Sequence, residues 1–543
     1  RFLHRFQETT QERNHSIQME RLQETPHGDG NLKAAPDPGY GGGNGGCIAP
    51  NGTLPCGWLG RLSRELHWSF VLAVVAVYGA CQGVGSSFGS VAAGYYWKDV
   101  QRVQPAASQF YQGVVNVPWV VKPLWGLFTD VVPVAGYRRR PYLLLAGVMG
   151  VSSMLTLALR RTPAIAPALV AFTTQAAGAA IADVVVDAMV AQNSISHPPL
   201  AADMQSLCGY CSSAGALVGY SISGLVVHAI GSQGALGLLS IPSVLVFSAG
   251  ILVKEDRAKD FEYNQVHKKF YEAVESMWAT LKCPQVWRPC VYMFLMFVLS
   301  PDIQGGLFYW YTDSSTGLAF SEGFIGLIYS IGSVGSLLGV LLYQSMLKDY
   351  PFRGLLLWGQ LLACLSGMID LVLVTRLNLR VGMPDYLFAV IDNSVSQLIG
   401  QLKWLPLLVL CSKLCPVGIE GTFFALLMSI QNLGLLMSAW WGGLLLHALG
   451  VTRTEFGNLW VAVLARNAMR LLPLAFLFLV PRSDQNSTIL PAEMLLADGG
   501  SPGDVEPGAS GAIEFSVLHG DEHTEFVETE EEELELTPLM EKI

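Results

Sequence analysis

The chain has 543 residues, of which 51% are hydrophobic and 14% are charged, whereas soluble domains usually carry about 25% charged residues. This deficit excludes an ordinary soluble protein and indicates that much of the chain lies in lipid. The formal net charge of −10 does not describe the apolar part, because residues 483–543 hold 16 acidic residues and one basic residue, while residues 1–482 hold 32 basic and 27 acidic residues.

The two ends of the chain are polar. Residues 1–57 are rich in glycine, and we expect them to form a disordered cytoplasmic segment. Residues 483–543 predict a second disordered segment, an acidic cytoplasmic tail. Segments of such composition bury too little apolar surface to offset the entropy lost on folding.

Apolar segments of about 20 residues, the length that spans a bilayer core, recur between these ends. They lack the alternation of lipid-facing strands, and open sheet edges are not tolerated in lipid. The sequence therefore predicts an all-α membrane protein with twelve transmembrane helices. The predicted spans are residues 68–94, 106–128, 141–159, 168–192, 205–230, 235–253, 289–309, 322–343, 354–374, 387–411, 422–446 and 459–480.

An internal repeat relates the two halves of this series. Residues 224–231 and 443–450 are identical at five of eight positions, at an offset of 219, and the same offset carries Gly215 onto Gly434. Three matches at one offset, Asp130 onto Asp349 being the third, indicate a duplicated unit of six helices.

The longest internal connection, residues 254–288, lies between the sixth and seventh spans. Its apolar residues recur at helical spacing among charges, which predicts an amphipathic helix at the inner membrane surface. We therefore expect a six-helix bundle over residues 58–253, a cytoplasmic connection over 254–288 and a second bundle over 289–482. Two such pseudo-repeats describe the major facilitator fold, which binds its substrate midway between its halves.

A short basic turn separates the second and third spans. Gly126 and Asp130 end one apolar segment, and Gly136 and three arginines precede the next. The pattern resembles the loop between helices two and three of the major facilitator transporters, where the aspartate and the arginines hold neighbouring helix ends together. The residues that we expect to act in conformational gating are Lys122, Gly126, Asp130, Arg138, Arg139, Arg140 and Glu420.

The distribution of basic residues predicts the orientation. Sixteen lysines and arginines fall in the short loops and flanks on the side of the termini, and seven fall on the opposite side. Because positive residues favour the cytoplasmic side, we expect both termini to be cytoplasmic. Whether the protein lies in the plasma membrane, the vacuolar membrane or the plastid envelope is left open.

Several charged residues lie inside the predicted spans, where each costs on the order of 3 kcal/mol and normally faces a cavity or a partner. Asp183 and Asp187 are one helical turn apart on one face. A carboxylate in a dry cavity can hold a proton near neutral pH and release it when the conformation changes, so we expect these two to couple transport to protons. The alternative is structural ion pairing, for instance of Asp187 with a cation of the other half.

Basic residues inside the second half suggest an anionic substrate, because arginines in a dry cavity stay charged and bind carboxylates. Four nearby residues, Phe308 to Tyr311, are aromatic and either stack on a flat ring or form a membrane-interface belt. The residues that we expect to bind substrate are Asp302, Lys403, Arg466 and Arg470.

No sequence pattern indicates a catalytic site, a metal site or a cofactor, and the basic residues do not form a nucleic-acid-binding stripe. The ten cysteines lie mostly in apolar segments and imply no disulfide framework. The expected partners are a small-molecule substrate, protons and the lipid bilayer.

Over about residues 58–482 the chain resembles the folate–biopterin transporter family, most closely its plant members. The resemblance implies transport of folates and pterins by alternating access, with protons. The motifs that carry it are residues 96–99, 118–126, 136–140, 183–187 and 413–425.

Other functions remain open from the residues alone. One is a carrier of another organic anion, or of a cationic metabolite met by Asp183 and Asp302. Another is a receptor or scaffold that signals through the acidic tail without transporting anything. A scaffold gains nothing from charges near the membrane midplane, so these charges favour a carrier.

Overall fold

The computed structural model describes residue 62 and residues 65–160, 164–197, 200–255, 257, 266–348, 350–415 and 420–482. All of them belong to one compact unit, residues 55–543. Apart from an isolated bridge between Val134 and Tyr137, the regular secondary structure of the described residues is helical. The predicted disordered segments, residues 1–57 and 483–543, lie outside the described residues.

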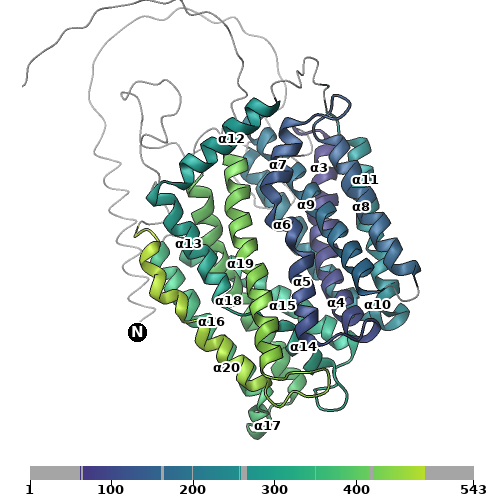
Figure 1. The fold of residues 1–543 in the computed structure, drawn as a ribbon, viewed down its shortest axis with the longest axis vertical. Helices are drawn as coiled ribbons and strands as arrows, with labels where there is room; N and C mark the ends of the chain where they lie inside the picture. The colour runs from purple at the N-terminus through teal and green to yellow at the C-terminus, as the bar shows by residue number, and fades with distance from the viewer. Residues whose placement is uncertain are drawn as a thin grey trace, which may run out of the picture. The chain divides into compact units, whose positions relative to one another are not determined.

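The first half contains long helices that follow one another with short connections (Figure 1). Its helices are α3 (Trp68–Val74), η1 (Val75–Gly85), α4 (Ser86–Tyr95), η2 (Tyr96–Val100), α5 (Pro105–Val115), α6 (Val117–Val120), α7 (Lys122–Val131), α8 (Arg140–Leu159), α9 (Ile165–Ser196), α10 (Ala201–Leu238) and α11 (Ser240–Leu252).

The second half follows the connecting helix α12 (Val266–Leu281). Its helices are α13 (Pro284–Val298), α14 (Gln304–Thr312), α15 (Glu322–Leu342), η5 (Tyr343–Leu347), α16 (Phe352–Val374), α17 (Leu377–Arg380), α18 (Asp385–Lys413), α19 (Glu420–Ala448), α20 (Leu459–Met469) and η6 (Leu472–Leu479).

Nine helices in the described residues are long and apolar enough to cross a membrane. One of them, Leu207–Leu252, contains two predicted spans that meet at Gly231, whose φ is +73°. Two other predicted spans are interrupted. The chain leaves helical geometry at Val121 between α6 and α7, and α13 ends before Pro301 in the second half. Prolines lack the N–H that would continue a helix, so these two spans are short consecutive helices.

Equivalent glycines of the sequence repeat occupy equivalent places. Gly231 and Gly450 both have positive φ, +73° and +67°, and each follows the span that carries the repeat. Gly215 of α10 packs against the backbone of η1, and Gly434 of α19 packs against Phe297 of α13. The fifth span thus contacts the first as the eleventh contacts the seventh.

The two halves meet along two helix pairs. α5 packs against α19, and α10 packs against α15. Figure 1 shows α7 and α12 at one end of the helices and α14 and α17 at the other. We call the first the arginine-turn end, because residues 132–140 lie there, and the second the α14 end.

The connecting helix α12 contacts α7 and α13 at the arginine-turn end. Its apolar side chains Tyr271, Val274 and Trp278 are exposed, as an amphipathic helix at a membrane surface requires. The predicted helix within residues 254–288 is therefore present.

Candidate functional site

The first half contains a buried group of one lysine and two aspartates. Lys122 is the first residue of α7, and Asp183 and Asp187 lie one turn apart on α9. The Lys122 ammonium forms an ion pair with Asp183 and a second with Asp187, 3.1 Å from its Oδ2. Lys122 is 8% exposed and Asp183 is 4% exposed, whereas the Asp187 side chain is 40% exposed. One carboxylate is thus sealed and the other is accessible.

Two neutral side chains of the first span complete this group. Tyr78 donates a hydrogen bond from its hydroxyl to Asp187, and Gln82 donates one from its amide to Asp183. Both come from η1, a stretch of π-helix, which is often found at functional sites. The sequence reasoning missed them, although two polar side chains four residues apart in an apolar span were a usable signal.

The alternative of ion pairing between helices is present in this conformation, but the partner of Asp187 is Lys122 of the same half and not a cation of the other half. Lys122 was expected to act in gating and Asp183 and Asp187 in proton coupling. The structure brings all three together.

Neutralising Lys122 should destabilise the protein, because two carboxylates would share a buried site without a cation. We expect Lys122→Gln to cost about 3–5 kcal/mol, as the loss of one partner from a buried ion pair usually does. Thermal unfolding of the purified protein measures the loss. In the double variant Lys122→Gln/Asp183→Asn most of the lost stability should return. A double variant that loses the sum of the two single losses would contradict the pairing.

The second half contains a corresponding group of one arginine and two aspartates. Arg466 of α20 donates from Nη2 to Oδ2 of Asp370 in α16 at 2.5 Å. Asp392 of α18 lies near Asp370, because Ser366 and Ser396 are hydrogen-bonded at 2.7 Å one helical turn away on the same two helices. Arg466 is 4% exposed. Its charge is therefore already balanced by a carboxylate, which leaves it less suited than predicted to bind a substrate.

Sequence reasoning missed Asp370 and Asp392. Both lie in predicted spans, and the rule that selected Asp183 applies to them equally. Asp370 was missed because it lies only four residues from the predicted end of its span, and Asp392 because it lies close to the beginning of the next.

Lys403 and Arg470 form a pair of cations in the second half. Arg470 donates from Nη1 to the carbonyl oxygen of Ala363 at 3.1 Å. The Lys403 ammonium lies 6.0 Å from the ring centroid of Phe297. It is close enough to Arg470 for the two positive charges to repel each other. Among the described residues, neither cation has a carboxylate at ion-pair distance. Asp370 and Asp302 act on Arg470 only from beyond ion-pair distance.

Asp302 joins the two halves. Its Oδ2 accepts a hydrogen bond from Nε2 of Gln109 at 2.6 Å, and the Oε1 atom of the same glutamine accepts from the N–H of Gly305 at 2.9 Å. One side chain of α5 thus holds the loop between α13 and α14. Asp302 was expected to bind substrate; in this conformation it closes the contact between the halves.

Further hydrogen bonds between the halves gather at the α14 end. They are Lys98 Nζ to Thr312 O (3.2 Å), Tyr309 Oη to Val103 O (3.1 Å), Trp440 Nε1 to Phe110 O (3.3 Å), Arg453 N to Gln104 Oε1 (3.1 Å) and Arg453 Nη1 to Arg102 O (3.3 Å).

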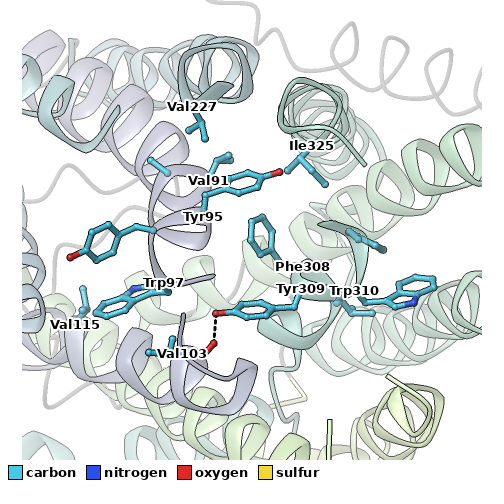
Figure 2. Packing of buried hydrophobic residues seen from close by; sticks show 14 of the residues in the cluster. Val91, Tyr95, Trp97, Val103, Val115, Val227, Phe308, Tyr309, Trp310 and Ile325 are labelled. Atoms are coloured by element: carbon cyan, nitrogen blue, oxygen red, sulfur yellow. Dashed lines mark hydrogen bonds between the residues drawn. The ribbon is translucent and has the colours of Figure 1, made fainter. Parts of the chain in front are cut away.

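Aromatic packing seals the same end (Figure 2). Phe308 stands edge-on to Tyr95 with ring centroids 5.1 Å apart, and an added Cβ on Gly94 would touch the Phe308 ring. Tyr309, Trp310 and the neighbouring Tyr311 are buried in the same cluster. The alternative of a membrane-interface belt is therefore wrong for these residues, because they pack between helices. The two halves are closed at the α14 end.

Two glycines related by the sequence repeat allow this closure. A Cβ added to Gly224 of α10 would collide with the backbone of Glu322, and one added to Gly443 of α19 would lie 2.9 Å from the carbonyl oxygen of Ala106 in α5. Each glycine thus permits the close approach of one helix pair across the interface between the halves.

Alanine at either glycine should open the α14 end. We expect Gly224→Ala and Gly443→Ala to increase labelling of a cysteine introduced at Ser108, which is buried at this interface, by an impermeant maleimide in a cysteine-free background. Gly209→Ala is the matched control, because nothing lies within 4 Å of that Cβ. Equal labelling in all three variants would show that these glycines do not govern closure.

The basic turn holds two helix ends together through Glu255. Its carboxylate accepts hydrogen bonds from the backbone N–H groups of Arg138 (2.6 Å), Arg139 (2.9 Å) and Arg140 (2.9 Å). It thereby satisfies N–H groups at the start of α8, where negative charge is favoured. In return, Arg140 donates from Nη2 to the carbonyl oxygen of Ile251 at the end of α11 at 2.7 Å.

The remaining residues of the predicted gate are only partly described. Gly126 faces α9, where an added Cβ would make an ordinary contact of 3.5 Å with Val184. The side chains of Asp130 and Glu420 lie outside the described part of the structure. The acid that holds the arginine turn, Glu255, was not predicted from the sequence.

The family of the chain follows from comparison with known proteins. Residues 82–494 match the BT1 family. This chain belongs to the BT1 family. It is 56% identical over 465 residues to probable folate-biopterin transporter 2 of Arabidopsis thaliana, covering 86% of this chain and 93% of that protein. It is 34% identical over 425 residues to the folate-biopterin transporter of Synechocystis sp., covering 78% and 84%.

Solved structures of other transporters share the fold. The nucleoside transporter NupG superposes with a TM-score of 0.55 at 13% identity, covering 76% of this chain and 99% of that chain. A POT family transporter in complex with 5-aminolevulinic acid gives a TM-score of 0.56 at 12% identity, covering 76% and 94%. At these identities the likeness concerns the fold alone.

These findings confirm the predicted resemblance to the folate–biopterin transporters. The BT1 chain is an integral, multi-pass membrane protein whose helical fold is shared by solved transporters such as NupG, and it is a transporter rather than an enzyme.

Proposed function

We propose that this BT1 family member carries folates or pterins across a membrane by alternating access, with transport coupled to protons. The observation that carries the substrate class is the pair of cations, Lys403 and Arg470, without an acidic partner among the described residues. The names of the relatives supply the chemical class, since several are called folate-biopterin transporters.

The architecture that we propose has twelve spans in two repeats of six. It counts the two broken spans and divides Leu207–Leu252 at Gly231. The equivalent packing of Gly215 and Gly434 supports the repeat. The excess of basic residues at the arginine-turn end supports cytoplasmic termini, and the structure is then closed toward the outside.

The chemistry of folate suits the cation pair. Folate combines a flat pterin ring with a glutamate that carries two carboxylates, and charged side chains in a site of low dielectric bind carboxylates strongly. Because Asp370 neutralises Arg466, we assign the carboxylate contacts to Arg470 and Lys403. Asp302 then acts in closure, together with Gln109.

The lysine group of the first half is the proposed proton-coupling site. Lys122 binds two carboxylates, of which Asp187 is accessible and Asp183 is sealed. A proton that arrives at Asp187 would neutralise one of the two acids, so that Lys122 would bind Asp183 alone. Because Lys122 begins α7 directly after the break at Val121, the loss of one ion pair would free this short helix to move.

Substrate recognition is tested by removing each cation in turn. We expect Arg470→Gln and Lys403→Gln to raise the KM for folate more than that for biopterin, which lacks the glutamate. Loss of one charge-assisted hydrogen bond costs about 1.5–3 kcal/mol, roughly a ten- to hundredfold change in KM.

The measurement is uptake into proteoliposomes with folate, biopterin and an unrelated organic anion. Arg380→Gln, at an exposed arginine of α17, is the matched control. A common shift for folate and biopterin would exclude the carboxylate contact. Uptake of the unrelated anion alone would move the substrate class away from folates and pterins.

Proton coupling is tested at both aspartates: Asp187→Asn removes the proposed proton acceptor, and Asp183→Asn removes the carboxylate that holds Lys122 while Asp187 is protonated. Each variant should lower the accumulation driven by a pH gradient more than it lowers the exchange of substrate at equal pH, because exchange needs no net proton movement. Asp99→Asn, at an exposed carboxylate outside the group, should affect neither. If accumulation and exchange fell equally in both variants, the two aspartates would serve binding or folding rather than coupling.

A further inference from the structure

The group of Arg466, Asp370 and Asp392 in the second half has two carboxyl groups and one ion-paired cation, so one carboxyl group has no ion-pair partner. Asp370 is joined to Arg466 at 2.5 Å, so one negative charge meets one positive charge. Asp392 is 2% exposed and has no ion pair with Arg466 among the described contacts. An ionised carboxylate at such a position would be buried beside another carboxylate, which is strongly unfavourable.

The closeness of the two acids bears on which of them carries a proton. Ser366 and Ser396 are hydrogen-bonded at 2.7 Å between α16 and α18. Asp370 and Asp392 lie one helical turn further along these two antiparallel helices, so that the two acids are close together. Two ionised carboxylates have only acceptor oxygens, so they can form a hydrogen bond only when one of them carries a proton. Asp370 is the partner of Arg466 and therefore the ionised member. A proton held by this pair would therefore lie on Asp392, which has no cation of its own among the described residues.

The surroundings support a neutral Asp392. Its Oδ1 atom is buried without a hydrogen-bond donor among the described residues, a loss that a carboxylic acid tolerates better than a carboxylate. The charged or titratable groups around the pair are Arg466 from α20, Asp370 from α16 and Tyr311 from α14, with Tyr329 of α15 beside Tyr311. Arg466 is the cation ion-paired within this group, and Arg470, one turn along α20, acts on Asp370 from beyond ion-pair distance.

We propose that Asp370 and Asp392 form a second proton-binding site of the carrier, a carboxyl–carboxylate pair held by Arg466. The site joins three helices, α16, α18 and α20, of the half that also carries Lys403 and Arg470. A movement that places Arg466 between the two carboxylates, as Lys122 lies between Asp183 and Asp187, or that opens the site to water would stabilise both anions, and the proton would leave to the aqueous phase. In its role for transport this inference rests on the proposed function; the protonation itself does not.

Infrared spectroscopy tests the protonation without any substrate. The protein purified in lipid nanodiscs at neutral pH should show the carbonyl stretching band of a protonated carboxylic acid, and Asp392→Asn should remove its Asp392 component. Asp385→Asn is the matched control on the same helix, because Asp385 is ion-paired with Arg376 at 2.5 Å. This variant should leave the band unchanged.

A second variant covers the case in which Asp392→Asn does not fold. Asp392→Glu keeps the carboxyl group and should keep the band at a shifted position. The proposal is overturned if folded Asp392→Asn has the spectrum of the wild type, or if the band of Asp392→Glu is not shifted, because the protonated acid would then lie elsewhere.

Transport gives an independent measure of the role of the site. Each coupled proton adds up to about tenfold accumulation per unit of pH gradient. Asp392→Asn should therefore lower gradient-driven accumulation by up to about tenfold per pH unit and leave exchange active. If wild type and variants all fail to transport folate, the proposed function is wrong while the infrared result still decides the proton site. If the band behaves as expected but accumulation is unchanged, the coupling role is rejected.

Discussion

The cost of charge inside a membrane protein governs this structure. An ionisable side chain in a span needs a partner, a proton or an aqueous surface, and the two halves meet this need in parallel ways. The first half places Lys122 between Asp183 and Asp187. The second half places Arg466 beside Asp370, with Asp392 close to both. Each group has two acids and one cation, so each has one acid whose charge state can change.

Lys403 and Arg470 depart from this rule, and the departure is informative. Both lie in the second half without an ion-pair partner among the described residues. Cations that are left unbalanced in a protein interior are costly unless another molecule supplies the negative charge. In the mechanism that we propose, this asymmetry assigns proton binding to the acids and binding of an anionic substrate to Lys403 and Arg470.

The sequence was sufficient for some of these features and not for others. Helical periodicity places Asp183 and Asp187 on one face, and the length of apolar segments predicts the spans, including the two that the structure shows as broken helices. The partners come from helices far apart in the chain. Lys122 reaches Asp183 across 61 positions and Gln109 reaches Asp302 across 193, and such distances leave no local pattern.

Because of the break at Val121, α7 is a separate short helix with a contact at each end. This helix has ten residues and is therefore a rod about 15 Å long. Lys122 stands at its first position, and its last residue leads directly into the turn that carries Arg138 to Arg140, which Glu255 fastens to the start of α8. A tilt imposed at one end must displace the other, so in the proposed mechanism this helix would convert the gain or loss of one ion pair into motion at the arginine-turn end.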